Sequence, residues 1–192
     1  SSGSVTLGAG AKLKISGSDF AFTAGALNGA SGKIEIASNT TTFSNATSGS
    51  AEIAVSASTA TVSFNGTHAG TGKLSLTAGT ITGNGTADFS SLDWSGGSLN
   101  ANVKSTGNTT ISGAGTKLIT GNLTLGGNTT WDGSTIAGSG TAKIKNESGK
   151  TFSATADGAI TGTATFTNEG TFEKTSGVTG GATDIQTRFD SS

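Results

Sequence analysis

The sequence predicts an all-β fold, a parallel β-solenoid (β-helix) of about ten coils with roughly 18 to 20 residues in each. Three observations support this prediction: a composition rich in small and β-branched residues, short strands with alternating apolar and polar side chains, and a nearly constant spacing between those strands. A β-sandwich or jelly roll is the alternative, because it also has short strands separated by turns.

Small residues dominate the composition. Thr, Gly, Ser, Ala and Asn account for 130 of the 192 residues, whereas Ile, Leu, Val, Phe and Trp account for 37. Because Gly, Thr, Ser and Asn disfavour helix interiors, we expect almost no helix. A narrow solenoid needs few large apolar side chains per coil, and Gly adopts the positive φ angles of tight corners. The absence of Pro leaves every backbone N–H available for strand pairing.

Several strands in the first half of the chain alternate charged and aliphatic residues with a period of two, which is typical of half-buried strands. Four of them contain Leu13, Ile34, Ile53 and Leu74, which are almost evenly spaced in the sequence and each have a charged neighbour. We therefore expect each strand to pair with its equivalents in the coils above and below.

A second pattern consists of an apolar residue, a small residue and then Gly or Ala. It begins at eight positions, which from the second onward are 17 to 24 residues apart, while the first step of 37 covers about two units: Leu27, Phe64, Ile81, Leu99, Ile119, Ile136, Ile160 and Val178. Trp94 and Trp131 each lie five residues before one of them, so we expect the two tryptophans at matching positions of their coils.

The even composition predicts one solenoid domain over residues 1–183. The repeat pattern is lost over residues 184–192, which we expect to form a frayed C-terminal tail. The start at Ser1, with neither Met nor a signal peptide, favours a mature segment or an excised fragment.

Two segments, residues 121–127 (GNLTLGG) and 133–141 (GSTIAGSGT), carry a resemblance to known proteins. The chain resembles the Gly/Thr/Ser/Asn-rich repeats of bacterial autotransporter passengers and filamentous-haemagglutinin-like adhesins over roughly residues 4–180. The resemblance implies a right-handed parallel β-helix on a bacterial surface that serves as a stalk or adhesive fibre. The coil length is less regular than in that family, and these 192 residues include no translocator or secretion domain.

Composition also excludes several classes of function. A net charge of −1 gives no general attraction to nucleic acid, and no apolar run approaches the roughly 20 residues of a membrane-inserted helix. The chain has no Cys, and its one histidine, His68, has no nearby second ligand; we expect it on the surface. We expect no metal and no cofactor.

Catalysis by paired carboxylates is not favoured, because the twelve acidic residues are scattered along the chain. The closest approach to a site is Asp88 near Asp93, with Asp132 beside Trp131. We expect these carboxylates on solvated faces and turns, and we expect that the protein is not an enzyme.

Two sets of residues are candidates for binding or modification. Trp94 and Trp131 would form a carbohydrate-stacking platform if exposed, but burial is the favoured interpretation because the core is short of aromatic area. Asn-x-Ser/Thr sequences provide eight possible glycosylation sites, for which ordinary turn positions are the favoured interpretation: Asn39, Asn45, Asn65, Asn84, Asn108, Asn122, Asn128 and Asn146.

The leading functional hypothesis is an extracellular, non-catalytic structural or adhesive segment of a bacterial surface or secreted protein, with surface glycans or other cells as partners. The alternative is a subunit that joins end to end into a filament. An ice-binding solenoid is a third hypothesis, prompted by the Thr-x-Thr triplets that begin at Thr40, Thr80, Thr161, Thr163 and Thr165, although we expect them not to be in register on many successive coils. A polysaccharide-active β-helix is the fourth.

Overall fold

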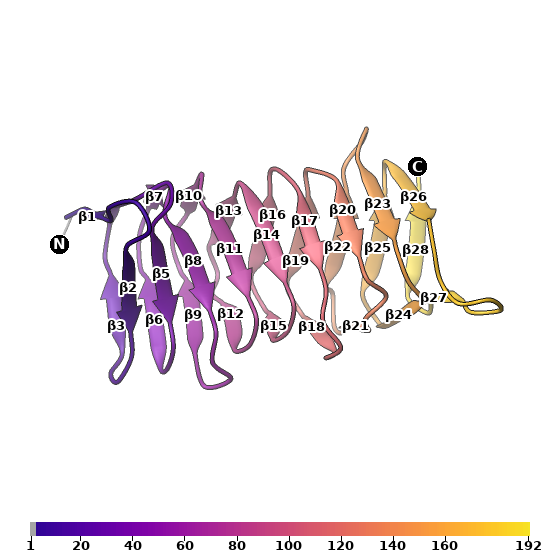
Figure 1. Ribbon diagram of the computed structural model, residues 1–192, viewed down its shortest axis with the longest axis horizontal. Coiled ribbons are helices and arrows are strands. Elements are labelled where there is room, and N and C mark those ends of the chain that lie inside the picture. Colours follow the sequence, from indigo (N-terminus) through magenta and orange to yellow (C-terminus); the bar gives the residue numbers. More distant parts are fainter. Residues whose placement is uncertain (1–2) are drawn as a thin grey trace.

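The computed structural model describes residues 3–192 and shows an all-β chain wound into three parallel sheets (Figure 1). Each coil contributes one strand to each sheet, and successive coils stack along the axis of a rod. The predicted β-solenoid is confirmed. The sandwich is excluded, because the paired strands of all three sheets are parallel. The stack contains about nine coils rather than ten.

We name the sheets A, B and C in the order in which the chain visits them. Sheet A has ten strands: β1 (Val5–Thr6), β4 (Gly25–Asn28), β7 (Thr47–Gly49), β10 (His68–Gly70), β13 (Thr86–Phe89), β16 (Asn102–Ser105), β19 (Asn122–Leu125), β22 (Lys143–Asn146), β25 (Thr165–Asn168) and β28 (Arg188–Ser191).

Sheets B and C have nine strands each. Sheet B contains β2 (Lys12–Ile15), β5 (Lys33–Ile36), β8 (Glu52–Val55), β11 (Lys73–Leu76), β14 (Ser91–Trp94), β17 (Thr109–Ile111), β20 (Thr129–Trp131), β23 (Thr151–Ala154) and β26 (Thr171–Lys174). Sheet C contains β3 (Phe20–Phe22), β6 (Thr40–Phe43), β9 (Thr61–Phe64), β12 (Thr80–Thr82), β15 (Ser98–Leu99), β18 (Lys117–Ile119), β21 (Ile136–Gly138), β24 (Gly158–Gly162) and β27 (Thr183–Ile185).

Residues paired in register through successive strands form columns along the rod. Leu13, Ile34, Ile53 and Leu74 belong to one inward-facing column of sheet B, as predicted. The same column continues through the rest of the sheet to Phe172, with steps of unequal length. The average step lies at the upper end of the expected coil length, which is why fewer coils fit into the chain.

The apolar residues of the second sequence pattern occupy equivalent positions in only some of the coils. Ile81, Leu99 and Ile119 share one column of sheet C, but Ile136 pairs with Lys117 and is therefore two residues out of that register. Leu27 lies in sheet A instead, and Val178 lies in an exposed loop. The pattern marks any strand that ends at a Gly corner, so it does not distinguish one sheet from another.

Corner glycines allow neighbouring coils to approach closely. Gly83 has φ of +115°, and a Cβ atom there would lie 2.1 Å from the carbonyl oxygen of Phe64 in the preceding coil. A larger residue would both strain the backbone and collide with the neighbouring coil.

Regular strands take the place of the frayed tail expected over 184–192. Strand β27 pairs with β24, and β28 pairs with β25, so the winding continues to Ser191. Ile185 follows Ile160 in its column after an unusually long step, because an extended loop over 175–182 precedes β27. That insertion shifted the spacing and hid the final strands from the sequence pattern.

Candidate functional site

The outer face of sheet B carries alternating basic and acidic residues over the first five coils. Three lysines and three carboxylates line a shallow cavity of about 400 Å³ together with Ser and Thr hydroxyls, and we call it the sheet B groove: Lys12, Lys33, Lys73, Glu35, Glu52 and Asp93. These residues project to the same side because their apolar neighbours point into the core.

Ion pairs in the groove join adjacent coils, two of them diagonally and the Lys33–Glu52 pair between directly opposite residues. Lys12 Nζ lies 2.7 Å from Glu35 Oε2, and Lys33 Nζ lies 3.2 Å from Glu52 Oε1. Lys73 Nζ lies 2.8 Å from Asp93 Oδ2. The pairs balance the charges of the groove, and the further donors of each ammonium group can reach a bound polar ligand.

Two serines add hydroxyl donors to the carboxylates. Ser56 Oγ donates to Glu35 Oε1 at 3.2 Å, and Ser75 Oγ donates to Glu52 Oε1 at 2.8 Å. The hydrogen bond from Lys12 lowers the pKa of Glu35, and the hydrogen bond to Asp93 raises the pKa of Lys73. Both groups are therefore charged near neutral pH, so Glu35 cannot act there as a general acid.

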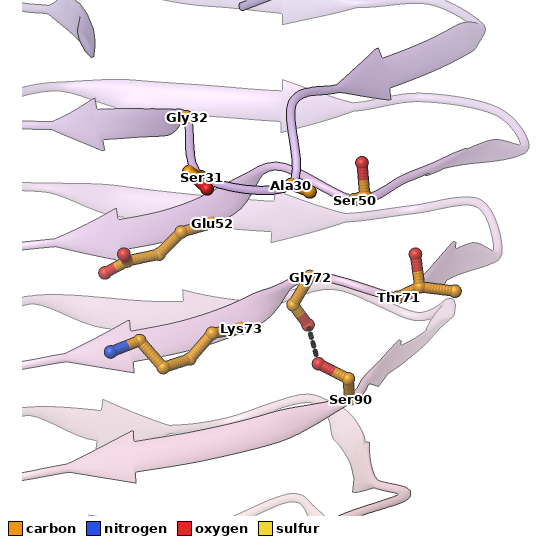
Figure 2. A pocket seen from close by; sticks show the side chains of 9 residues that line it. All are labelled: Ala30, Ser31, Gly32, Ser50, Glu52, Thr71, Gly72, Lys73 and Ser90. Atoms are coloured by element: carbon orange, nitrogen blue, oxygen red, sulfur yellow. Dashed lines mark hydrogen bonds between the residues drawn. The ribbon is translucent and has the colours of Figure 1, made fainter. Parts of the chain in front are cut away.

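A second cavity of about 260 Å³ adjoins the groove at the corner between sheets A and B. Figure 2 shows its lining: Glu52 and Lys73 extend along their strands, while the hydroxyls of Ser50 and Thr71 stand on the corner loops of adjacent coils. Ser90 Oγ donates to the carbonyl oxygen of Gly72 at 3.0 Å and links two of these corners. Groove and corner cavity share Glu52 and Lys73 and form one polar surface.

The sequence contained the signal for this surface. The nearly even spacing that aligns Leu13 with Ile34, Ile53 and Leu74 also aligns the charged residues beside them. The expectation that the carboxylates are scattered is wrong for three of them, although they are far apart in sequence. The stacking of coils brings Glu35, Glu52 and Asp93 to one face.

The acidic residues singled out beforehand do not come together. Asp88 lies on the outer face of sheet A and Asp93 on that of sheet B. Asp132 lies in a loop, where its carboxylate accepts hydrogen bonds from the backbone N–H groups of Gly113 at 2.7 Å and Ser134 at 3.1 Å. This carboxylate stabilises two turns.

Trp94 and Trp131 occupy one inward-facing column of sheet B, separated by Ile111, and both are fully buried. The matching positions predicted for them are confirmed. They offer no exposed platform for carbohydrate stacking. Trp131 Nε1 donates to the carbonyl oxygen of Ser134 at 2.8 Å, whereas Trp94 Nε1 has no partner among the described residues.

Seven of the eight asparagines in Asn-x-Ser/Thr sequences are exposed: Asn39, Asn45, Asn65, Asn84, Asn108, Asn122 and Asn128. The eighth, Asn146, is buried, and its amide donates to Asn168 Oδ1 at 2.8 Å and to the carbonyl oxygen of Thr171 at 3.1 Å. This burial argues against Asn146 as a glycosylation site, because the folded chain has no room for a glycan there.

His68 is not on the surface, where we expected it. Only 2 % of its surface is exposed, and its ring packs against Phe43, Phe64 and Phe89. Its Nδ1 atom lies 2.9 Å from Thr47 Oγ1. Burial lowers the pKa of His68 to about 4, so the ring is neutral at physiological pH.

The outer face of sheet C differs from the other two, because Thr, Ser, Ala and Leu occupy its outward positions from β6 to β24. Thr40, Thr61 and Thr80 form one column, and Thr42, Ser63 and Thr82 form the column beside it. The triplets over 40–42 and 80–82 therefore share their register, with Thr61-Val62-Ser63 in the coil between them, and the register extends over three coils rather than many. The triplet over 165–167 lies on sheet A.

Among residues 3–192, no group of three or more acidic, histidine or cysteine side chains is arranged to hold a metal ion. The same residues include no helix with the length and hydropathy needed to span a bilayer. No protein-family model, curated protein or solved structure matches the chain.

Proposed function

We propose that this chain is a non-catalytic structural and adhesive rod of an extracellular or cell-surface protein. The observation that carries this proposal is the unbroken ladder: each of the three sheets runs without interruption from the first coil to the last. Such a stack buries one continuous core and unfolds as a cooperative array of neighbouring coils. The rod then presents its faces at fixed positions along its length.

The sheet B groove is the adhesive surface in this proposal, and its ligand class is a polyhydroxylated glycan. Its ion pairs leave ammonium donors and carboxylate acceptors along the rod axis, together with the hydroxyls of Ser56 and Ser75. Alternating donors and acceptors suit the hydroxyl groups of an extended sugar chain. The resemblance to bacterial adhesin repeats agrees with this use.

A glycan array and an assay of adhesion to immobilised cells test the adhesive function. The variant K12S/K33S/K73S should lose at least tenfold in binding, because it removes all three lysines of the groove. The matched control K104S/K143S/K145S removes three lysines from the outer face of sheet A and should bind like the wild type. Equal loss in both variants, with unchanged thermal midpoints, would reject the groove as the adhesive site.

Ice binding is a second candidate, favoured by the register of the Thr and Ser columns on sheet C. Strand pairing places these side chains roughly 4.8 Å apart between coils, with roughly 6.6 Å between the two outward positions of a strand. Thermal hysteresis of the wild type should disappear in T61K/T80K. It should persist in T110K/T130K, which adds two lysines to exposed positions of sheet B. No thermal hysteresis at millimolar wild-type protein would eliminate this candidate.

A further inference from the structure

One outward position in the sheet B groove has no polar side chain. Residues of five successive coils form an outward column there: Lys14, Glu35, Ala54, Ser75 and Asp93. Ala54 points outward, because its neighbours Ile53 and Val55 belong to the core and Ala54 does not. It lines the groove, yet only 6 % of its surface is exposed. Its methyl group is therefore the floor of a depression between longer side chains, which we call the Ala54 pit.

The ion pairs of the groove explain why the pit exists. Lys12 and Lys73 each pair with a carboxylate that lies two residues beyond the position directly opposite on the next coil. For Lys33 the corresponding position is Ala54, so Lys33 pairs with the directly opposite Glu52 instead. A carboxylate is thus missing from the pit, although the charge of Lys33 is still balanced.

Hydrogen-bonding groups surround the Ala54 methyl group. Glu52 Oε1 lies 3.2 Å from Lys33 Nζ and accepts a hydrogen bond from Ser75 Oγ at 2.8 Å. These two partners belong to the coils on either side of Ala54, so the Glu52 carboxylate is held over the coil that carries the pit. A carboxylate has about four acceptor sites and an ammonium group three donors. Glu52 and Lys33 therefore both keep capacity for a bound ligand.

The side chains that line the groove carry no net charge, because three lysines and three carboxylates are joined there in three pairs. A charged ligand group would either meet a like charge or separate one of these pairs, which costs free energy where water is partly excluded. A neutral group avoids this cost. The pit therefore suits a neutral group that donates one hydrogen bond, accepts another and carries a methyl group.

We propose that the Ala54 pit binds the acetamido group of an N-acetylhexosamine in a glycan. The acetyl methyl group rests on Ala54, the amide N–H donates to the carboxylate of Glu52, and the amide C=O accepts from the ammonium group of Lys33. A hydroxyl group in place of the acetamido group leaves the Ala54 methyl without an apolar contact. This proposal rests on the glycan-binding function of the groove and names the sugar that the groove selects.

Binding of matched sugars to the wild-type chain is the first test. Chitotetraose carries an acetamido group on each unit where cellotetraose carries a hydroxyl group, and a glycan array provides such pairs in other linkages. The wild type should bind the N-acetylated member about tenfold more tightly, because it gains a buried methyl group and an amide hydrogen bond. In saturation-transfer NMR with N-acetylglucosamine, the acetyl methyl protons should give the strongest signal.

Filling the pit is the second test. Ala54→Leu covers the floor with a larger side chain and should abolish the preference for N-acetylated sugars. Thr130→Leu is the matched control, because Thr130 lies in the same outward column, two coils beyond Asp93 and outside the groove. This control should keep the full preference. Thermal midpoints establish that both variants are folded.

The outcomes separate the acetamido site from the function of the groove. Equal binding of both members of every pair by the wild type would overturn the acetamido site and leave the groove as a glycan-binding surface. An unchanged preference in folded Ala54→Leu would do the same. Absence of binding to every glycan would overturn the acetamido site and the glycan-binding function together.

Discussion

The two halves of the rod enclose polar groups in different ways. In the N-terminal half, His68 lies among Phe43, Phe64 and Phe89, and its neutral ring contacts the hydroxyl of Thr47. In the C-terminal half, Lys117 and Asn146 occupy inward positions, but their polar ends reach backbone carbonyl groups at the corners. One half excludes charge from the core, and the other satisfies polar groups at its margin.

The difference shows what a solenoid interior tolerates. Lys117 is fully buried, yet its ammonium group donates to the carbonyl oxygens of Gly113 and, at 2.9 Å, Gly115. Burial lowers the pKa of Lys117. The long side chain of Lys117 reaches the corner loop that precedes its own strand, whereas the short imidazole of His68 stays among its aromatic neighbours.

The largest effect should come from removing an aromatic ring around His68. We expect Phe64→Ala to reduce the free energy of unfolding by about 3 to 5 kcal/mol, because it leaves a cavity between Phe43 and Phe89. The same change should raise the pKa of His68 by admitting water. Chemical denaturation gives the first quantity, and NMR titration of the single histidine gives the second. An unchanged pKa of His68 would show that Phe64 does not exclude water from the imidazole ring.

The next effect is a pH dependence that originates in the N-terminal half. The pKa of His68 is about 4 in the folded chain against an ordinary value of 6.5, so the unfolded chain binds the proton more readily. Stability should therefore be full above about pH 6.5 and fall by about 3 kcal/mol as the pH drops to 4. Denaturation at several pH values measures this loss. In His68→Gln, the loss between these pH values should shrink, and a loss as steep as in the wild type would assign it to other groups.

In the C-terminal half we expect a loss of stability that does not depend on pH. Asn146→Ala removes the donor to Asn168 and to the carbonyl oxygens of Lys150 and Thr171. We expect a loss of about 2 to 3 kcal/mol, because buried acceptors are left without partners. Denaturation of this variant at pH 7 and pH 5 should give the same difference from the wild type. Asn122→Ala, at an exposed position, serves as its control.

The smallest expected effect is a difference in stability between variants of the two tryptophans that share one column. Trp131→Phe should cost about 1 kcal/mol more than Trp94→Phe, because only the Trp131 indole donates a hydrogen bond, while the Trp94 N–H is buried without a partner in the described chain. Both variants keep an aromatic ring in the core. Denaturation midpoints of the pair decide the matter, and equal costs would show that the bond to Ser134 contributes nothing measurable.

The sequence alone predicted the strands and their stacking in sheet B. Alternation around Leu13, Ile34, Ile53 and Leu74 places one residue of each pair inside, and a nearly constant step places the strands above one another. The matching positions of Trp94 and Trp131 followed from the second pattern, in which each lies five residues before an apolar residue. These features are local in sequence, and the ladder of hydrogen bonds repeats them from coil to coil.

Where the coil length varies, only the tertiary structure decided which side chains point into the core and which residues of adjacent coils pair with each other. Coils of unequal length and the loop before β27 cannot be assigned to corners from a sequence rich in Gly, Ser and Thr. Burial of His68, Lys117 and Asn146, the groove of sheet B and the Thr columns of sheet C all depend on that assignment. A shift of one residue moves a side chain from the core to the solvent, so each corner had to be placed before any surface could be known.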